Sequence, residues 1–178
     1  MAKTEKAAAR GRNDKLATPT DLDPADAEKV AKALNGVLAD SFVHFMKIKN
    51  FHWHMSGPNF RDYHEMLDEH AAAVFGTIDV LAERVRKIGH RTLTSYAEAL
   101  EETQLKEQTR ADLAPDEMIA ELMEDNKAMA KGMREAHGVC DDAKDVASAS
   151  FLEIYIDETE KRTWFLFEIA QTATATGH

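Results

Sequence analysis

The stretch from Asn50 to Arg84 reads NFHWHMSGPNFRDYHEMLDEHAAAVFGTIDVLAER. Its second part has the apolar periodicity of one long helix. Four side chains that could bind a metal ion lie along this helix: His64, Asp68, Asp79 and Glu83. At about 100° per residue, the last three fall within about 100° of His64. The four side chains therefore share one face, beside the apolar stripe that we expect to face the core.

The two halves of this set are too far apart to bind the same metal ion. Asp68 and Asp79 are eleven residues apart, or about 16 Å at 1.5 Å per residue. If two chains pack these helices antiparallel about a two-fold axis, the His64 end of one helix meets the Glu83 end of the other. Small alanines at 71–73 lie between the two halves and would permit a close approach. The sequence thus predicts a dimer interface with two identical metal sites, each built from both chains.

A further histidine, at the end of the preceding apolar stripe, completes the candidate ligand set: His52, His64, Asp68, Asp79 and Glu83. Imidazole and carboxylate ligands suit iron or manganese, and zinc is a tolerable substitute. Taken singly, His52 could be a core residue, and the distal carboxylates could pair with Arg84 or Lys87. No Glu in the chain is followed by His three residues later, which argues against a di-iron centre inside one bundle.

The composition favours one helical domain. The chain has 178 residues, 44% of them hydrophobic and 30% charged, with only four Pro and eight Gly. A single cysteine, Cys140, excludes an internal disulfide and fits a reducing compartment. The sequence has no apolar run of membrane-spanning length and no signal peptide at its N-terminus. We therefore expect a cytoplasmic protein without a membrane partner.

Helical periodicity recurs in four long segments and one short one. The long helices are expected from Asp23-Pro24 to before Gly57, from there to about Ile88, from Pro115 to Gly138, and from about Asp145 to Ala173, with a short helix over 95–102. Strand patterning is absent. The pattern predicts an all-α four-helix bundle with one long crossover, carried by a domain over residues 23–175 between a tail at 1–22 and a C-terminal end at 176–178.

The net charge of −10 is unevenly distributed. Residues 1–20 hold five basic and two acidic side chains, a net charge of +3, so the remainder carries −13. The basic residues of this flexible arm are Lys3, Lys6, Arg10, Arg12 and Lys15. A basic arm on an acidic body indicates a polyanion partner, although such an arm can also be only a solubilising segment.

The pattern F-H-W-H-M-S-G-P-N-F-x-x-x-H-E-M-L-D, followed by D-x-x-A-E-R, closely resembles the signature of the Dps family, the DNA-binding proteins from starved cells. The resemblance covers roughly residues 24–170. It implies a ferritin-like four-helix bundle, with the short extra helix in the long middle connection, that assembles into a shell of twelve subunits. It also implies ferroxidase sites that oxidise ferrous iron, preferably with hydrogen peroxide, and a ferric mineral stored inside.

The resemblance assigns roles to particular residues. It implies that His52, His64 and Asp68 of one subunit bind iron together with Asp79 and Glu83 of its neighbour. Trp53 is expected near the iron, where its oxidisable ring could intercept radicals, or else to be an interface aromatic residue. His54 departs from the residues common at its position; it is expected to be a surface histidine, with an extra weak ligand as the alternative.

An iron pore and DNA binding are two further implications. The family's acidic pores lie near the start of the last helix, where this chain has Asp141, Asp142 and Asp145; here Val146, Ala147 and Ser150 stand in place of acidic residues common in the family. The basic arm could hold DNA without reading its sequence, which would associate the protein with the nucleoid. The alternatives are a nucleoid-packing protein with a minor or zinc-occupied metal site, and a plain helical scaffold.

Overall fold

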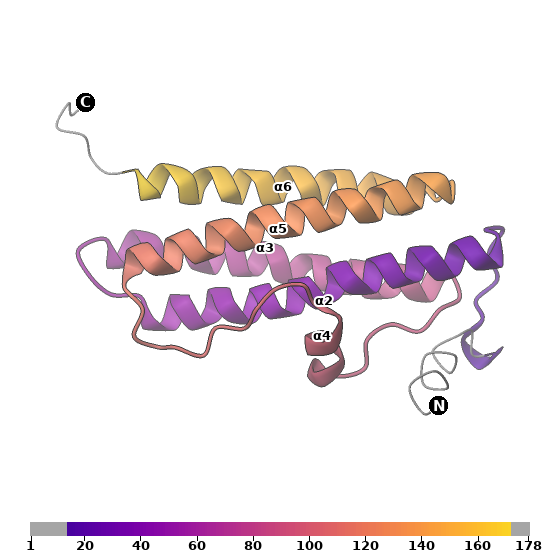
Figure 1. Cartoon of the computed structure of the whole chain (residues 1–178), viewed down its shortest axis with the longest axis horizontal. Helices are drawn as coiled ribbons and strands as arrows, with labels where there is room; N and C mark the ends of the chain where they lie inside the picture. Colours follow the sequence, from indigo (N-terminus) through magenta and orange to yellow (C-terminus); the bar gives the residue numbers. More distant parts are fainter. Residues whose placement is uncertain (1–13, 172–178) are drawn as a thin grey trace.

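Four long helices form the body of the protein (Figure 1). The structure is a computed structural model, which describes residues 14–171. Its elements are η1 (Asp14–Leu16), α2 (Pro24–His54), α3 (Phe60–Lys87), α4 (Tyr96–Glu102), α5 (Pro115–Asp142) and α6 (Val146–Ala170). Residues 14–171 contain no strand. The predicted all-α four-helix bundle with a short helix in the middle connection is confirmed.

The helices pack as two hairpins, α2 with α3 and α5 with α6, and α2 lies against α5 between them (Figure 1). Short connections make each hairpin antiparallel. The connection between α3 and α5 is long because it must return along the bundle, and its helix α4 packs on α2. Within residues 14–171, no helix combines the length and the apolar character needed to cross a lipid bilayer.

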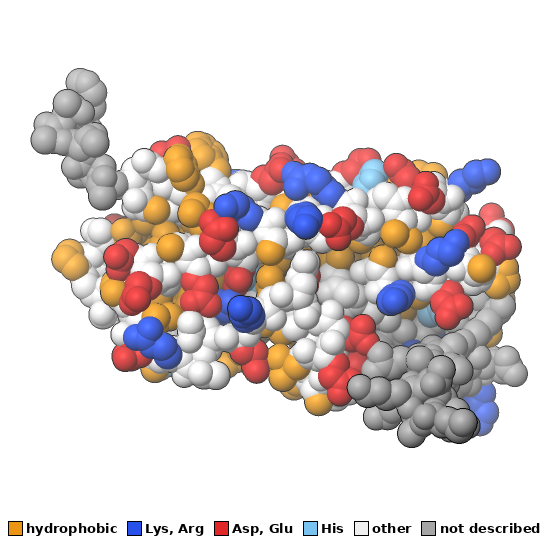
Figure 2. All heavy atoms as spheres, viewed as in Figure 1, with side chains coloured by type: hydrophobic (Ala, Val, Ile, Leu, Met, Phe, Trp, Pro, Cys, Tyr) orange, Lys and Arg blue, Asp and Glu red, His pale blue; other side chains and the backbone are white. Residues whose placement is uncertain are grey.

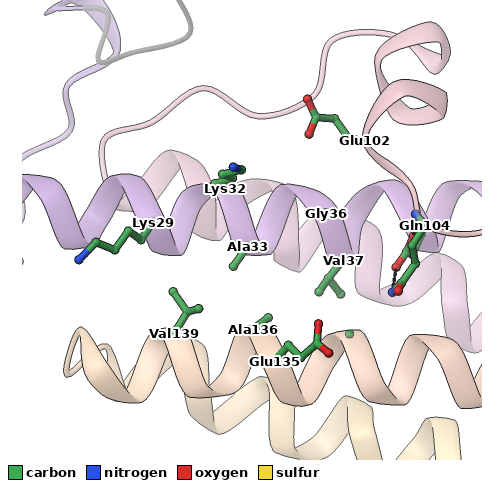
Figure 3. Close-up of a pocket in the computed structure, with 12 residues that line it drawn as sticks. Lys29, Lys32, Ala33, Gly36, Val37, Glu102, Gln104, Glu135, Ala136 and Val139 are labelled. Atoms are coloured by element: carbon green, nitrogen blue, oxygen red, sulfur yellow. Dashed lines mark hydrogen bonds between the residues drawn. The ribbon is translucent and has the colours of Figure 1, made fainter. Parts of the chain in front are cut away.

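A buried carboxylate of α2 binds the middle of the crossover. Asp40 accepts hydrogen bonds from Thr103 Oγ1 at 2.6 Å, from Gln104 N at 2.9 Å and from Gln104 Nε2 at 2.7 Å. These contacts close one end of a groove of about 470 Å³ between α2 and α5 (Figure 3). None of the five predicted metal ligands lines this groove.

The helix ends follow local chemistry and correct two predicted boundaries. The Asp23 carboxylate accepts a hydrogen bond from Ala25 N at 2.9 Å and so caps α2. Gly138 does not end α5, which continues to Asp142, and α6 begins at Val146 and ends at Ala170. A glycine stops a helix only where the backbone turns left-handed; Gly89 does so at φ +84°.

Residues 14–22, which the sequence predicted to belong to the N-terminal tail, contact the body of the protein. The Arg86 guanidinium donates to the carbonyl of Leu16 at 3.1 Å, and Leu22 packs against the core. The chain here passes so close to Gly89 that a Cβ on this glycine would lie 2.8 Å from the carbonyl oxygen of Thr18. Residues 1–13 and 172–178 lie outside the described part of the chain, and with them the predicted C-terminal end at 176–178.

The core consists of two apolar clusters separated by a polar layer. One cluster occupies the part of the bundle around Leu34, Leu81, Met133 and Leu152, and the other the part around Phe51, Leu67, Leu122 and Leu166. The buried polar side chains between them include His44, Lys47, His70, Asn126, Thr159 and Arg162. A polar layer at this depth needs internal partners, because burial removes its side chains from water.

Candidate metal centre

Two histidines face each other where α2 ends and α3 begins. His52 Nδ1 lies 2.9 Å from the carbonyl oxygen of His64, and His64 Nδ1 lies 2.8 Å from the carbonyl oxygen of His52. Their rings stack with centroids 3.7 Å apart and planes 20° apart. Because a carbonyl can only accept, each Nδ1 must carry its proton. Each Nε2 therefore keeps a lone pair that can bind a metal ion.

The short α2–α3 connection creates this reciprocal pair. Gly57 adopts φ +99°, a conformation that glycine reaches without steric cost, and Met55 is buried beneath the turn. The Phe60 ring lies 5.0 Å from the His64 ring, centroid to centroid. The turn thus fixes both the tautomer and the orientation of the two imidazoles before any metal binds.

Asp68 adds a carboxylate one helical turn after His64. Its Oδ1 lies 4.0 Å from His52 Nε2 and 2.7 Å from Lys49 Nζ. The hydrogen bond from the Lys49 ammonium holds the pKa of Asp68 below its usual value, so the carboxylate is ionised at neutral pH. Lys49 Nζ also lies 5.9 Å from the ring centroid of Trp53, which is 58% exposed beside the pair.

Asp79 and Glu83 do not join these three ligands within one chain. Both are exposed on α3, and Glu83 accepts from Lys87 Nζ at 3.0 Å. Arg84, the other partner considered from the sequence, is bound by Asp145 instead. Over residues 14–171, no three His, Cys, Asp or Glu side chains converge closely enough to hold a metal ion by themselves. A single chain thus offers an incomplete set, as expected for half-sites.

The α2–α3 hairpin, which carries the half-sites, has a surface with large exposed apolar side chains in the single chain. Its large hydrophobic side chains, all at least 39% exposed, are Met46, Trp53, Phe60, Phe75 and Val80. Exposed apolar surface of this kind marks contacts with other molecules. The sequence argument for a close helix approach used three alanines, yet Ala71 is buried within the chain. The aromatic residues are the stronger sign of an interface, and helical spacing in the sequence could have revealed them.

Known proteins share both the sequence and the fold of this chain. The profile of the ferritin-like domain family matches residues 31–175. A DNA protection during starvation protein from Brevibacillus brevis is 37% identical over 137 residues, which cover 77% of this chain and 91% of that protein. The chain belongs to the Dps family of ferritin-like proteins. A DNA protection during starvation protein from Helicobacter pylori is 29% identical over 138 residues, covering 78% of this chain and 96% of the relative.

Solved Dps structures agree with this assignment. The crystal structure of a Dps protein from Bacillus brevis superposes with a TM-score of 0.80 at 33% identity, covering 84% of this chain and all of the other. DpsC from Streptomyces coelicolor has a TM-score of 0.86 over 90% of this chain and 94% of its own, at 24% identity. The second likeness concerns the fold alone.

In this Dps chain, one of the predicted pore residues makes contacts inside the subunit. Asp145 is buried, caps α6 by accepting from Ser148 N at 3.1 Å, and binds the Arg84 guanidinium at 2.5 Å. Its Oδ2 accepts from Ser148 Oγ at 2.5 Å. Both oxygens therefore have partners inside the subunit, which supports a structural role for Asp145, and its pore role stays a prediction. Asp141 and Asp142 are exposed at the α5–α6 turn, and their pore role remains a prediction.

The structure describes only the C-terminal end of the predicted DNA-binding arm. Lys15 is exposed in η1, whereas Lys3, Lys6, Arg10 and Arg12 lie outside the described residues. On the face of the body shown in Figure 2, acidic and basic side chains are intermixed. This face offers no broad basic surface to a nucleic acid, so the arm remains the only candidate that the sequence supplied.

Proposed function

We propose that this Dps protein oxidises ferrous iron with hydrogen peroxide at sites between subunits and stores the ferric product inside a shell of twelve copies. The supporting observation is the reciprocal histidine pair, which uses both Nδ1 atoms for backbone contacts and has the Asp68 carboxylate 4.0 Å from His52 Nε2, on a hairpin with an exposed apolar face. A second copy on that face would add Asp79 and Glu83. Five ligands from two chains would then surround the iron.

This ligand set suits the proposed reaction. Two Fe²⁺ ions each give one electron to one peroxide, the O–O bond breaks, and two protons are taken up: 2 Fe²⁺ + H₂O₂ + 2 H⁺ give 2 Fe³⁺ + 2 H₂O. Two-electron reduction avoids the one-electron cleavage that releases a hydroxyl radical. Carboxylates stabilise the higher charge of Fe³⁺, and mixed imidazole and carboxylate coordination leaves positions open for the oxidant. Trp53 is placed to be oxidised in place of more distant residues if a radical forms.

A relative supports iron as the metal. A Dps protein from Vibrio cholerae, 27% identical with a TM-score of 0.82, is described as a member of a broad superfamily of ferritin-like diiron-carboxylate proteins. Ferrous titration of the assembled protein tests the proposal. Peroxide should oxidise about two Fe²⁺ per molecule consumed, faster than dioxygen does; no acceleration over a protein-free solution would refute the ferroxidase activity.

We further propose that the N-terminal arm binds DNA without sequence preference. The relatives are named for DNA protection, and the acidic body would repel a polyanion. Because the Leu16 carbonyl of η1 accepts a hydrogen bond from Arg86, the deletion should end before η1. Deletion of residues 1–13 removes four of the five basic side chains.

The deletion is expected to abolish the DNA gel shift at low salt and to leave iron oxidation unchanged. Binding by the full chain should fall steeply as salt is added, since phosphate contacts release counterions. Exchange of Lys3, Lys6, Arg10 and Arg12 for Gln is the matched variant, because it removes charge and keeps length. A gel shift that survives both changes would rule out the arm.

The alternative function, physical packing of the nucleoid with a minor or zinc-occupied metal site, makes the opposite prediction. It requires DNA protection in a protein that shows no measurable iron oxidation.

A further inference from the structure

A histidine without a hydrogen-bond partner lies inside the bundle. His44 of α2 is fully buried, and neither of its ring nitrogens makes a hydrogen bond with any residue in 14–171. Asp125 of α5 faces it, with Oδ2 at 3.5 Å from His44 Nδ1, which is longer than a normal hydrogen bond. Because a buried polar group without a partner costs free energy, this imidazole does not stabilise the fold through a bond of its own.

The facing carboxylate is already neutralised by a lysine. Lys47, one turn after His44 on α2, is 3% exposed, and its Nζ lies 2.7 Å from the same Asp125 Oδ2. This Nζ also lies 2.9 Å from Oε1 of Glu121, one turn before Asp125 on α5. A proton on His44 would therefore place a second positive charge beside Lys47, and both charges would compete for Asp125.

The other two long helices bring a cation and a neutral ring to this layer. Arg162 of α6 is 5% exposed, and Glu158 attracts it from a partly exposed position on the same helix. His70 of α3 is buried as well, and burial lowers its pKa to about 4, so its ring is neutral at neutral pH. A charged His44 would thus add to the buried positive charges of Lys47 and Arg162.

These surroundings determine the charge of His44. Burial lowers the pKa of its imidazole more than Asp125 raises it, and the positive charges of Arg162 and Lys47 lower it further. In an open state, where water reaches the ring, the pKa returns to about 6.5. Below that pH the open state binds a proton that the closed bundle does not bind, so acidification favours opening.

We propose that His44 is an acid-sensitive switch in the bundle: its neutral ring permits α2 to pack against α5, and its protonation separates the two helices. The switch has no effect above about pH 6.5, and its effect grows as the pH falls below that value. The inference concerns the stability of the bundle and does not depend on iron oxidation.

The test is the pH dependence of urea unfolding for the assembled wild type and for His44→Leu, from about pH 7.5 to about pH 5. Below about pH 6.5, the unfolding constant of the wild type should rise relative to that of the variant by up to about tenfold per pH unit. Hydrogen exchange locates the effect. The exchange rate of α2 peptides around His44, taken as the ratio of wild type to variant, should be larger at the lower pH.

His54→Leu is the matched control, since His54 is an exposed histidine of the same helix, with its Nδ1 at 2.8 Å from the carbonyl oxygen of Asn50. It should follow the pH dependence of the wild type. His44→Gln, which is polar but does not titrate, accompanies His44→Leu in case the apolar side chain disturbs the layer, and it should lose the same pH dependence. The proposal is overturned if the wild type and the His44 variants change in parallel over this pH range, or if neither His44 variant folds at neutral pH.

Discussion

Replacing both His52 and His64 by Ala is expected to reduce peroxide-driven oxidation of ferrous iron on the order of 100-fold or more. Changing a group that only supports a metal ligand typically lowers metal affinity or activity by about 10- to 100-fold. This variant removes two ligands outright. It also removes the reciprocal hydrogen bonds that orient them. The measurement is the initial rate of ferric absorbance after peroxide is mixed with ferrous-loaded protein.

His54→Ala is the matched control for this variant. His54 lies on the same helical turn, and its Nδ1 is 2.8 Å from the carbonyl oxygen of Asn50 within α2. Its Nδ1 thus has a partner in its own helix, and two residues of helix separate it from His52 by about 200° around the axis. The control should oxidise iron at the wild-type rate. Comparable rates for the double variant and the wild type would mean that iron is oxidised elsewhere.

Asp145→Ala is expected to destabilise the fold by about 3–5 kcal/mol, the typical cost of leaving one partner of a buried ion pair unpaired. The Asp145 side chain is 1% exposed and binds the Arg84 guanidinium at 2.5 Å. The substitution also removes the cap of α6. The measurement is the midpoint of denaturant unfolding for each variant under the same conditions.

Asp142→Ala separates this account from the pore role that the sequence suggested for Asp145. Asp142 is exposed at the C-terminal end of α5, so its loss should change the free energy of unfolding by no more than about 0.5 kcal/mol. If Asp145→Ala instead slowed iron uptake and left stability unchanged, its carboxylate would line a pore after all.

The helical bundle could be predicted from the sequence because helical periodicity is a local property. Each long helix carries an apolar stripe, and two turn signals, Gly57 and Gly89, mark the ends correctly. Gly138 misled because a glycine in a sequence does not reveal its φ value. The packing of residues 14–22 also escaped prediction, since Leu16 meets Arg86 across 70 residues of chain and no local pattern encodes that contact.

The candidate site was only partly visible in the sequence. Spacing along one helix placed His64, Asp68, Asp79 and Glu83 on one face, but the tautomers of the histidines depend on the geometry of the α2–α3 turn. The contacts of Asp145 inside the subunit could not be predicted, because an N-cap and a solvated acid are identical in a sequence.

The buried ion pairs of Lys47 were not predicted either. Lys47 lies about 180° around the helix from Leu38, off the apolar stripe of α2, and its spacing does not show that it meets Glu121 and Asp125 of α5.

The most direct test of the account is complementation between two inactive chains. One chain carries His52→Ala/His64→Ala and the other Asp79→Asn/Glu83→Gln, and the two are co-expressed in equal amounts. If every site takes its histidines from one subunit and its distal carboxylates from another, random pairing restores about one quarter of wild-type oxidation, because half of the pairs are mixed and each mixed pair has one intact site. Mixed assemblies as inactive as their parents would contradict a site shared between chains.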